Sequence, residues 1–430
     1  MIKNNSIKSV LNNIGWLIFD KLLILLMNII IIFIVANFYG PKKYGVYQYA
    51  TNIVLILEVI VQLVDGRVVK KKYSNGNYNE VVFSVTIAKV LLSSIALFSG
   101  VLIVLLSSKE IEFSYLLIVL LFDSIIRNIR FGLENRFEYI LQSKKIVIAS
   151  NIGLMVGTLL QLMAVYMQAS IILLAVIQMC STLISYIILL IQYKNTFGEV
   201  PVCHNKYNKI LIKEIIKEST PLAIATAAAT IYTRCDSVML GMLLTTKEVG
   251  IYSISSKFIS TIQMLVVPIQ TTIFVKMLEW KDKPRLYEDN YIKITSIATW
   301  LSIIGVAMSF VVLPFIFKFL KPDYLPALES YKILSLGSIL TYNAILRSSH
   351  FTIIGRGDIL MKTQIITVVV NVLLNYFLIR NLGMNGAAIA TVIAQIISLL
   401  ISNLFFKDAK FVFKVQLLGF NPRNIIKLIN

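Results

Sequence analysis

The residues best suited to chemistry in this sequence are charged residues that interrupt long apolar stretches. In the segment TIYTRCDSVMLG, residues 230–241, Arg234 and Asp236 stand in an apolar run that begins after Pro221. A guanidinium group can bind an anion, and a buried carboxyl group can orient a cation or carry a proton. If this run crosses a membrane, both charges are costly there and mark a functional site by default.

The same pattern recurs along the chain. Basic residues interrupt apolar stretches at Lys21, Lys89, Arg234, Lys257, Lys332 and Arg347, and acidic residues do so at Asp20, Glu58, Asp123 and Asp236. Such residues usually face the interior of a helix bundle or a water-filled cavity. A simpler interpretation holds near helix ends, where long side chains reach back to the membrane surface, and we favour it for Lys89, Lys332 and Arg347. Asp123 can pair with Arg127, one helical turn further on.

Composition identifies the medium in which these charges lie. The chain has 430 residues, of which 57% are hydrophobic and 15% charged, and its mean hydropathy is +0.79. Soluble domains are less apolar and carry about 25% charged residues. We therefore expect a polytopic membrane protein.

Twelve apolar segments are expected to be membrane-spanning helices. Most have close to the ~20 residues that a helix needs to cross the hydrocarbon core. Helices are expected because lipid cannot satisfy backbone polar groups, and the alternation of a membrane β-barrel is absent. The fourth segment is short and is expected to continue through Arg127 and Arg130. The segments are 14–37, 46–64, 84–106, 113–126, 146–166, 169–193, 220–243, 251–274, 294–317, 327–354, 360–379 and 386–406.

The basic residues alternate between the two sides of this arrangement. With the N-terminus in the cytoplasm, 28 Lys and Arg fall on the cytoplasmic side and 7 on the opposite side. Cytoplasmic loops of membrane proteins carry such an excess. Both termini are therefore predicted to be cytoplasmic. The net charge of +19 then reflects topology, and we do not expect a nucleic-acid partner.

Depth along the helices suggests how three of the charges are arranged. Arg234 lies about 15 residues into its span, or ~22 Å, which is past the midplane. Arg234 and Asp236 do not share a helix face and need separate partners. Lys257 lies at a similar depth in the next span. An Asp236–Lys257 contact would leave Arg234 to face an anionic ligand, and this contact is a hypothesis.

A weak internal repeat suggests two halves. The segment YGPKKYGVYQYATN (39–52) aligns with LTTKEVGIYSISSK (244–257), which matches Gly45 to Gly250. Two halves in the same orientation are typical of parallel-repeat transporters. We expect twelve helices in two six-helix halves around a central cavity. The predicted parts are an N-terminal half (1–193), a basic cytoplasmic linker (194–219), a C-terminal half (220–407) and a basic cytoplasmic tail (408–430).

Several kinds of chemistry are not indicated. The sequence has no nucleotide-binding motif of the type G-x-x-x-x-G-K-[ST] and no H-E-x-x-H pair, so we expect neither an ATP-driven motor nor a metal site or other cofactor. Its three cysteines suggest no disulfide framework. The predicted outer loops are short, whereas an enzyme acting on the outer face usually needs more structure there. We therefore do not expect an enzyme.

Three stretches resemble a known family. Residues 13–50 are similar to the opening of Wzx-type polysaccharide flippases of the multidrug/oligosaccharidyl-lipid/polysaccharide exporter superfamily, with Trp16, Asp20 and the loop YGPKKYG. Residues 220–253 resemble the start of the family's second half, and residues 381–397 resemble its last span. The family often has Glu at the position of Asp20 and Arg at that of Asn37. The second difference puts in question whether the first span contributes a cation to the ligand site.

The resemblance implies a function. Such proteins move an undecaprenyl-pyrophosphate-linked oligosaccharide across the bacterial cytoplasmic (inner) membrane for O-antigen, capsule or exopolysaccharide assembly. It also implies a polysaccharide polymerase and a chain-length regulator as partners. Alternating access would open the cavity to each side in turn. The candidates for pyrophosphate contact are Arg234 and Lys257, followed by Arg347 and Lys21, and the orienting or coupling acids are Asp236, Asp20 and Glu58.

Other interpretations stay open at this point. Glu58 has no evident basic neighbour in the sequence; it either carries a proton or Na⁺, or is an ordinary hydrogen-bonded residue. Buried amides either line a polar cavity or bond between helices: Gln161, Gln178, Gln263, Gln270, Asn371, Asn375 and Gln395. A cation-coupled drug antiporter of the same superfamily is the main alternative function. A membrane glycosyltransferase or polymerase is less favoured, because it would need a large outer loop.

Overall fold

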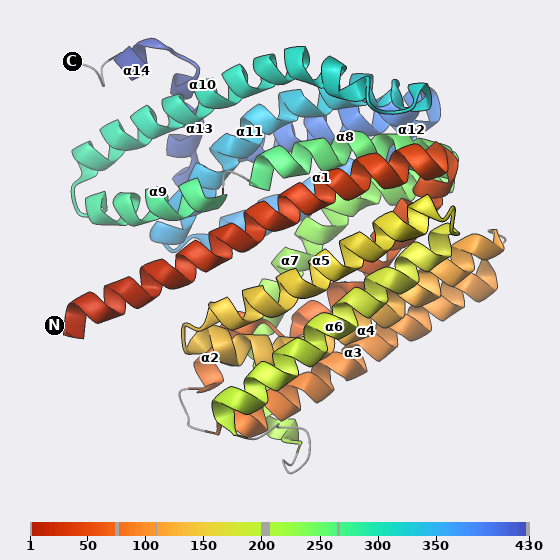
Figure 1. The fold of residues 1–430 in the computed structure, drawn as a ribbon. Coiled ribbons are helices and arrows are strands. Elements are labelled where there is room, and N and C mark those ends of the chain that lie inside the picture. The colour runs from red at the N-terminus through yellow and green to blue at the C-terminus, as the bar shows by residue number, and fades with distance from the viewer. Residues whose placement is uncertain (1, 74–76, 108–109, 199–206, 265–266, 427–430) are drawn as a thin grey trace. The chain divides into compact units, whose positions relative to one another are not determined.

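The computed structural model describes residues 2–73, 77–107, 110–198, 207–264 and 267–426. The side chains of some helical residues in these ranges, Asp20 and Lys21 among them, lie outside the described residues. Every long regular element in the described ranges is a helix (Figure 1). The expected all-α architecture is thus confirmed, while the count of twelve spans and the side on which the termini lie stay predictions.

The chain divides into two compact units. The first unit comprises residues 1–39 and 46–230, and the second comprises residues 40–45 and 231–430. The first contains most of α1 (Ile2–Leu57), which turns at Gly40, where φ is 72°. It continues through η1 (Glu58–Leu63), α2 (Gly66–Lys72), α3 (Tyr78–Leu106), α4 (Ile111–Tyr139), α5 (Ser143–Tyr166), α6 (Ile171–Phe197) and the first part of α7 (Lys209–Leu243).

The second unit begins inside α7. Its long helix α12 (Gly357–Gln395) reverses at Gly383, where φ is 58°. Short helical turns follow this helix. The other elements are α8 (Thr246–Met264), α9 (Val267–Trp280), α10 (Pro284–Phe317), η3 (Pro322–Tyr324), α11 (Ala327–Ile353), η4 (Ile396–Leu400), η5 (Ile401–Leu404), η6 (Lys407–Ala409), α13 (Lys410–Gly419) and α14 (Arg423–Ile426).

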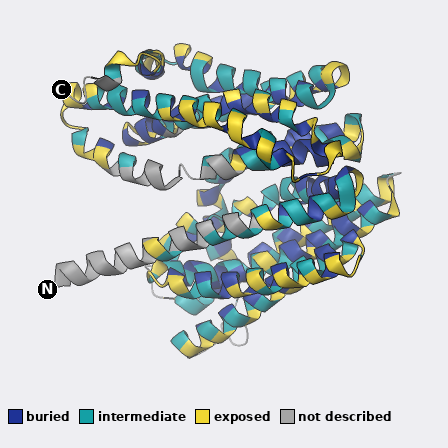
Figure 2. Cartoon of the chain, turned by 45° about the horizontal axis from the view of Figure 1, so that its top comes forward, coloured by how far each residue is buried: buried dark blue, intermediate teal, exposed yellow. Residues whose placement is uncertain are grey.

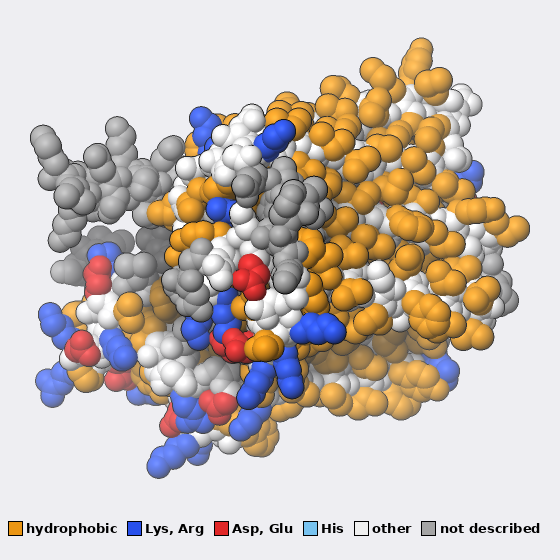
Figure 3. Space-filling view, turned by 90° about the horizontal axis from the view of Figure 1, so that it is seen from below, with side chains coloured by type: hydrophobic (Ala, Val, Ile, Leu, Met, Phe, Trp, Pro, Cys, Tyr) orange, Lys and Arg blue, Asp and Glu red, His pale blue; other side chains and the backbone are white. Residues whose placement is uncertain are grey.

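The burial pattern is typical of a membrane protein, whose outer surface contacts lipid. Five helical segments in the described ranges are long and apolar enough to cross a membrane. In α10 only 17% of the most apolar stretch is buried inside the protein, and in α3 only 22%. Exposed residues accordingly follow whole helix faces (Figure 2), and apolar side chains form a broad area on the face in Figure 3, with Lys, Arg, Asp and Glu gathered toward one end. In water such surfaces would associate. These features identify a multi-pass membrane protein.

Two sequence segments have more structure than loops would. Residues 209–219, placed in the predicted linker, form the first turns of α7, because Ile212 and Ile215 on one face are buried in the core of the first unit. In the predicted tail, Val412 and Val415 of α13 are fully buried in the core of the second unit. The boundaries of the predicted halves stay a prediction, but both segments are packed helices.

The glycines matched by the internal repeat lie against each other in the second unit. A Cβ atom on Gly45 would lie 1.7 Å from the carbonyl oxygen of Thr246, and one on Gly250 would lie 2.1 Å from that of Pro41. Only glycine permits this approach of the two backbones. The two glycines that the alignment matches thus lie close together, while the internal repeat stays a prediction.

Candidate functional site

Asp236 lies at the centre of a buried polar cluster in the second unit. The Tyr252 hydroxyl donates to its Oδ2 at 2.8 Å, and Asn375 Nδ2 donates to its Oδ1 at 2.7 Å. The Thr391 hydroxyl also donates to Oδ2, and Asn371 Nδ2 donates to the Thr391 oxygen at 3.2 Å. The carboxylate therefore has donors from α8 and from both arms of α12.

The local sequence explains how α12 supplies three of these groups. Asn371 and Asn375 are four residues apart and so share one helix face. The turn at Gly383 sends the chain back along itself, and Gly386 lets the arms approach: a Cβ there would lie 2.1 Å from the Leu378 carbonyl oxygen. Thr391 is thereby returned to the level of Asn371.

This cluster can hold a proton or a hard monovalent cation. Its acceptors are carboxylate, carboxamide and hydroxyl oxygens, which suit hard cations. Asn375 Oδ1 is buried without a hydrogen-bond partner, which adds an available oxygen. No group of three or more His, Cys, Asp or Glu able to hold a metal ion occurs in the described ranges. The cluster has a single carboxylate, so a monovalent cation suits it better than a divalent one.

Lys257 does not pair with Asp236. Its ammonium group donates to the Tyr44 hydroxyl at 3.1 Å and lies 5.4 Å from the centre of the Tyr44 ring. The hypothesis of an Asp236–Lys257 contact is therefore wrong. The physical reason is that hydroxyl and amide donors already surround Asp236, while Tyr44 offers Lys257 both an oxygen and an aromatic face.

Arg234 and Lys257 are two cations of the second unit. Arg234 is exposed on α7, and Lys257 lies on α8. In the described ranges neither cation lies within ion-pair distance of a carboxylate, nor does Arg234 have a hydrogen-bond partner. An anion would stabilise cations that have no counter-ion.

Arg347 lies in a different, buried network. Arg347 is only 3% exposed. Its Nε donates to Asn403 Oδ1 at 2.8 Å, and its Nη2 donates to Thr363 Oγ1 at 3.1 Å. Asn403 in turn donates to Gln416 of α13 at 2.9 Å. The interpretation that Arg347 reaches out to the membrane surface is therefore wrong, since neutral oxygens satisfy it inside the protein. Its contact with an anion stays a prediction.

Lys89 is also buried and not directed to the surface. Its ammonium group donates to the Val61 carbonyl at 2.8 Å and lies 3.9 Å from the centre of the Phe131 ring. Val61 lies in η1, where its carbonyl accepts from the Val64 N–H at 3.4 Å as well as from Lys89. Lys332 is exposed on α11, as a surface-directed lysine would be.

The first unit holds a second charged cluster, around Arg127. Arg127 Nη2 donates to Glu58 Oε1 at 3.2 Å, and the Ser124 hydroxyl also donates to that oxygen. Arg127 Nε lies 3.5 Å from Asp123 Oδ2, which confirms the expected pair. Glu58, which has no evident basic neighbour in the sequence, thus has a basic partner from α4, 69 positions away.

Sequence reasoning missed some of these groups. Tyr252 and Thr391 were not singled out for chemistry, and Arg127 was expected to pair with Asp123 but not with Glu58. The i, i+4 spacing of Asn371 and Asn375 was the available signal for the Asp236 cluster. Lys21 and Asp20 lie outside the described residues, so their roles stay predictions.

In the described ranges the fold is all-helical, with helices suited to cross a membrane, and it is shared with solved membrane proteins. The chain is similar to an inward-facing multidrug resistance MATE family transporter of the MOP superfamily, with a TM-score of 0.71 and 12% identity over 92% of this chain and 96% of that one. It is also similar to the lipid II flippase MurJ in an inward closed conformation, with a TM-score of 0.70 and 16% identity over 98% and 93%. A MOP superfamily transporter from Pyrococcus furiosus gives a TM-score of 0.53 and 14% identity over 96% of each chain.

The sequence itself assigns the chain to a family. Residues 10–275 match the family model described as polysaccharide biosynthesis protein. The chain belongs to that family, which confirms the resemblance found in its sequence. No curated protein matches the sequence. Its structural neighbours are named as transporters and flippases.

Proposed function

We propose that this protein is a flippase that moves undecaprenyl-pyrophosphate-linked oligosaccharide units across the bacterial cytoplasmic membrane. The units would serve O-antigen, capsule or exopolysaccharide assembly, together with a polysaccharide polymerase and a chain-length regulator. Membership of the polysaccharide biosynthesis family supports the general role. The observation that carries the choice of an anionic cargo is that Arg234 of α7 and Lys257 of α8 lie within ion-pair distance of no carboxylate in the described ranges.

The physical problem is to carry a pyrophosphate past hydrocarbon. The idealised cost of moving one ion from water into a medium of low dielectric constant is of order 20 kcal/mol. Fixed cations in a polar site lower that cost, and they lose their mutual repulsion when the anion binds. Arg234 offers bidentate geometry to a phosphate group, whereas Lys257 acts as a point charge beside it. The polyprenyl chain needs no such site, because it can remain in the lipid.

We assign coupling to the Asp236 cluster. Occupation of its oxygens by a proton or a monovalent cation would change the charge on α7 two positions from Arg234. Cation binding and anion binding would then influence each other through one helix, as linkage requires. Alternating access remains the proposed route for the cargo.

Complementation of a host that lacks its own flippase tests the cargo site. Arg234→Ala should abolish surface polysaccharide, and Arg234→Lys should retain part of it because the charge is kept. Lys332→Ala, which removes an exposed cation from α11, is the matched control and should export normally. Immunoblotting of membranes verifies that each variant is present. Normal export by Arg234→Ala would contradict the assignment.

A cation-coupled drug antiporter is the second candidate. The acid-centred Asp236 cluster favours it, since a coupling acid is what such an antiporter needs, and so does the fold likeness to a multidrug transporter. Ethidium efflux from cells that express the protein separates the two. Efflux that requires Asp236 but not Arg234 would favour the antiporter.

A further inference from the structure

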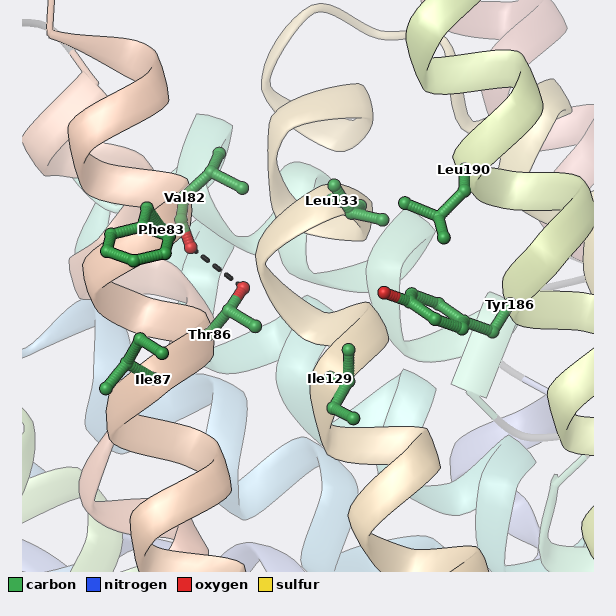
Figure 4. A pocket seen from close by; sticks show the side chains of 8 residues that line it. All are labelled: Val82, Phe83, Thr86, Ile87, Ile129, Leu133, Tyr186 and Leu190. Carbon is green, nitrogen blue, oxygen red and sulfur yellow. Dashed lines mark hydrogen bonds between the residues drawn. The ribbon is translucent and has the colours of Figure 1, made fainter. Parts of the chain in front are cut away.

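An apolar groove runs along the first unit between α3, α4 and α6. Figure 4 shows its walls, with Thr86 bonded back to the Val82 carbonyl and the Tyr186 hydroxyl pointing toward α4. The cavity between these side chains measures only about 50 Å³, which is too small for a compact ring. The lining residues are Val82, Phe83, Thr86, Ile87, Ile129, Leu133, Tyr186 and Leu190.

The open side of the groove faces lipid. Phe83 and Ile87 of its wall continue along α3, at intervals of three or four residues, into Leu91, Ile95 and Phe98, which are 54%, 49% and 65% exposed. Such spacing keeps all five on one helix face. An apolar face of this length belongs against acyl chains.

One end of the groove carries an arginine. Arg136 follows Leu133 by three residues on α4, its partner Tyr193 follows Leu190 by three on α6, and its partner Asn79 precedes Val82 by three on α3. Each step is about 4.5 Å along the helix. Because residues three apart share a helix face, the Arg136 site is the continuation of the groove.

The Arg136 guanidinium is held in place but not neutralised. Nη1 donates to Asn79 Oδ1 at 2.6 Å and to the Tyr193 hydroxyl, and the guanidinium carbon lies 3.8 Å from the centre of the Phe197 ring. No ion pair of Arg136 with a carboxylate occurs in the described ranges. Neutral partners and an aromatic face orient the cation and leave its charge available.

The charged groups around this site favour an anion. Lys145 donates to Thr196 beside it, and Lys194 is exposed at the end of α6. The nearby carboxylates have other partners: Glu138 accepts from Lys70 at 2.8 Å, and Glu80 accepts from Asn208 at 2.6 Å. The predicted topology places this end of the groove at the cytoplasmic leaflet.

We propose that α3, α4 and α6 form a binding site for one anionic phospholipid of the cytoplasmic leaflet. Its acyl chain lies in the groove, and its phosphate contacts Arg136. Basic pockets between transmembrane helices on the cytoplasmic side bind anionic head groups in this way. The site is separate from the cargo site and does not depend on the proposed function.

Tryptophan quenching by brominated lipid tests this site. Tyr186→Trp places a reporter in the groove of the full-length protein, reconstituted in phosphatidylcholine with increasing fractions of phosphatidylglycerol brominated on its acyl chains. We expect quenching of the reporter to saturate at low fractions of brominated phosphatidylglycerol, above the background from the three native tryptophans measured without the substitution. Brominated phosphatidylcholine should give only the quenching of bulk lipid.

Substitutions at the arginine decide the role of the charge. Adding Arg136→Gln should weaken the preference for phosphatidylglycerol about fivefold, in line with about 1 kcal/mol for one basic contact at the surface. Arg136→Lys should keep most of it, and Lys332→Gln, which removes an exposed charge from α11 of the second unit, should leave it within twofold. Thermal unfolding of each variant verifies that it is folded.

Three results would overturn the proposal. The groove would contact bulk lipid only if both lipids quenched equally. The site would not rest on Arg136 if a folded Arg136→Gln variant kept the full preference. Displacement of brominated phosphatidylglycerol by undecaprenyl phosphate at far lower mole fraction would make a polyprenyl carrier the occupant in place of a phospholipid.

Discussion

Replacing Asp236 by Asn tests whether its carboxylate is the acceptor that organises the second unit. The change keeps the shape but removes the charge from a group that accepts from Tyr252, Thr391 and Asn375. Hydrogen bonds to charged groups contribute about 1.5–3 kcal/mol and neutral ones about 0.5–1.5 kcal/mol. At about 1 kcal/mol lost for each of three bonds, the free energy of unfolding should fall by about 3 kcal/mol.

Reversible unfolding in mixed micelles of mild detergent and SDS measures this loss. Asp323→Asn, the same chemical change at an exposed position of η3, is the control and should stay within about 0.5 kcal/mol of the parent. Asp236→Ala should cost more than Asp236→Asn, because it leaves buried donors unpaired. A folded Asp236→Asn protein as stable as its parent would refute the reasoning, since the carboxylate would then not be an ionised acceptor.

Two further predictions concern stability. Gly250→Ala brings a methyl group against the Pro41 carbonyl and should destabilise the protein by about 1–3 kcal/mol. The control is Gly305→Ala, whose added methyl group has nothing within 4 Å and should not lower the midpoint of thermal unfolding. Equal effects of the two substitutions would contradict the close approach at Gly250. Lys72 and Lys71 donate to Glu218 and so lower the pKa of that carboxyl group. Its contribution to stability should therefore be present above the ordinary pKa of Glu and be lost as pH falls through the lowered value. Glu218→Gln should lower the unfolding midpoint at pH 7 and make no difference at strongly acidic pH, and a difference that persisted in acid would contradict the ion pair.

Interactions within one helix were accessible from the sequence, and those between helices were not. The extension of the fourth apolar segment through Arg127 is confirmed in α4, as is the Asp123–Arg127 pair one turn apart. Helical periodicity fixes both. Glu58 finds Arg127 only because two helices pack side by side, and no spacing rule covers such a contact.

Backbone irregularities account for other differences. The Asp236 cluster requires α12 to fold back at Gly383, and nothing in the sequence specifies which residue Thr391 then meets. Lys89 is buried because η1 offers it the Val61 carbonyl, a change of helix type that hydropathy does not reveal. The partners of the buried charges depended on these local departures from the α-helix.

The most direct test of the central claim is transport in a reconstituted system. Proteoliposomes would carry an undecaprenyl-pyrophosphate-linked oligosaccharide in both leaflets, and a glycosidase added outside would report on what reaches the outer leaflet. The account predicts that protein allows digestion of the inner-leaflet pool as well, and that Arg234→Ala, reconstituted to the same density, does not. The account would be contradicted if the parent protein left the inner-leaflet pool protected from the glycosidase, in vesicles where the same preparation moves a cationic dye.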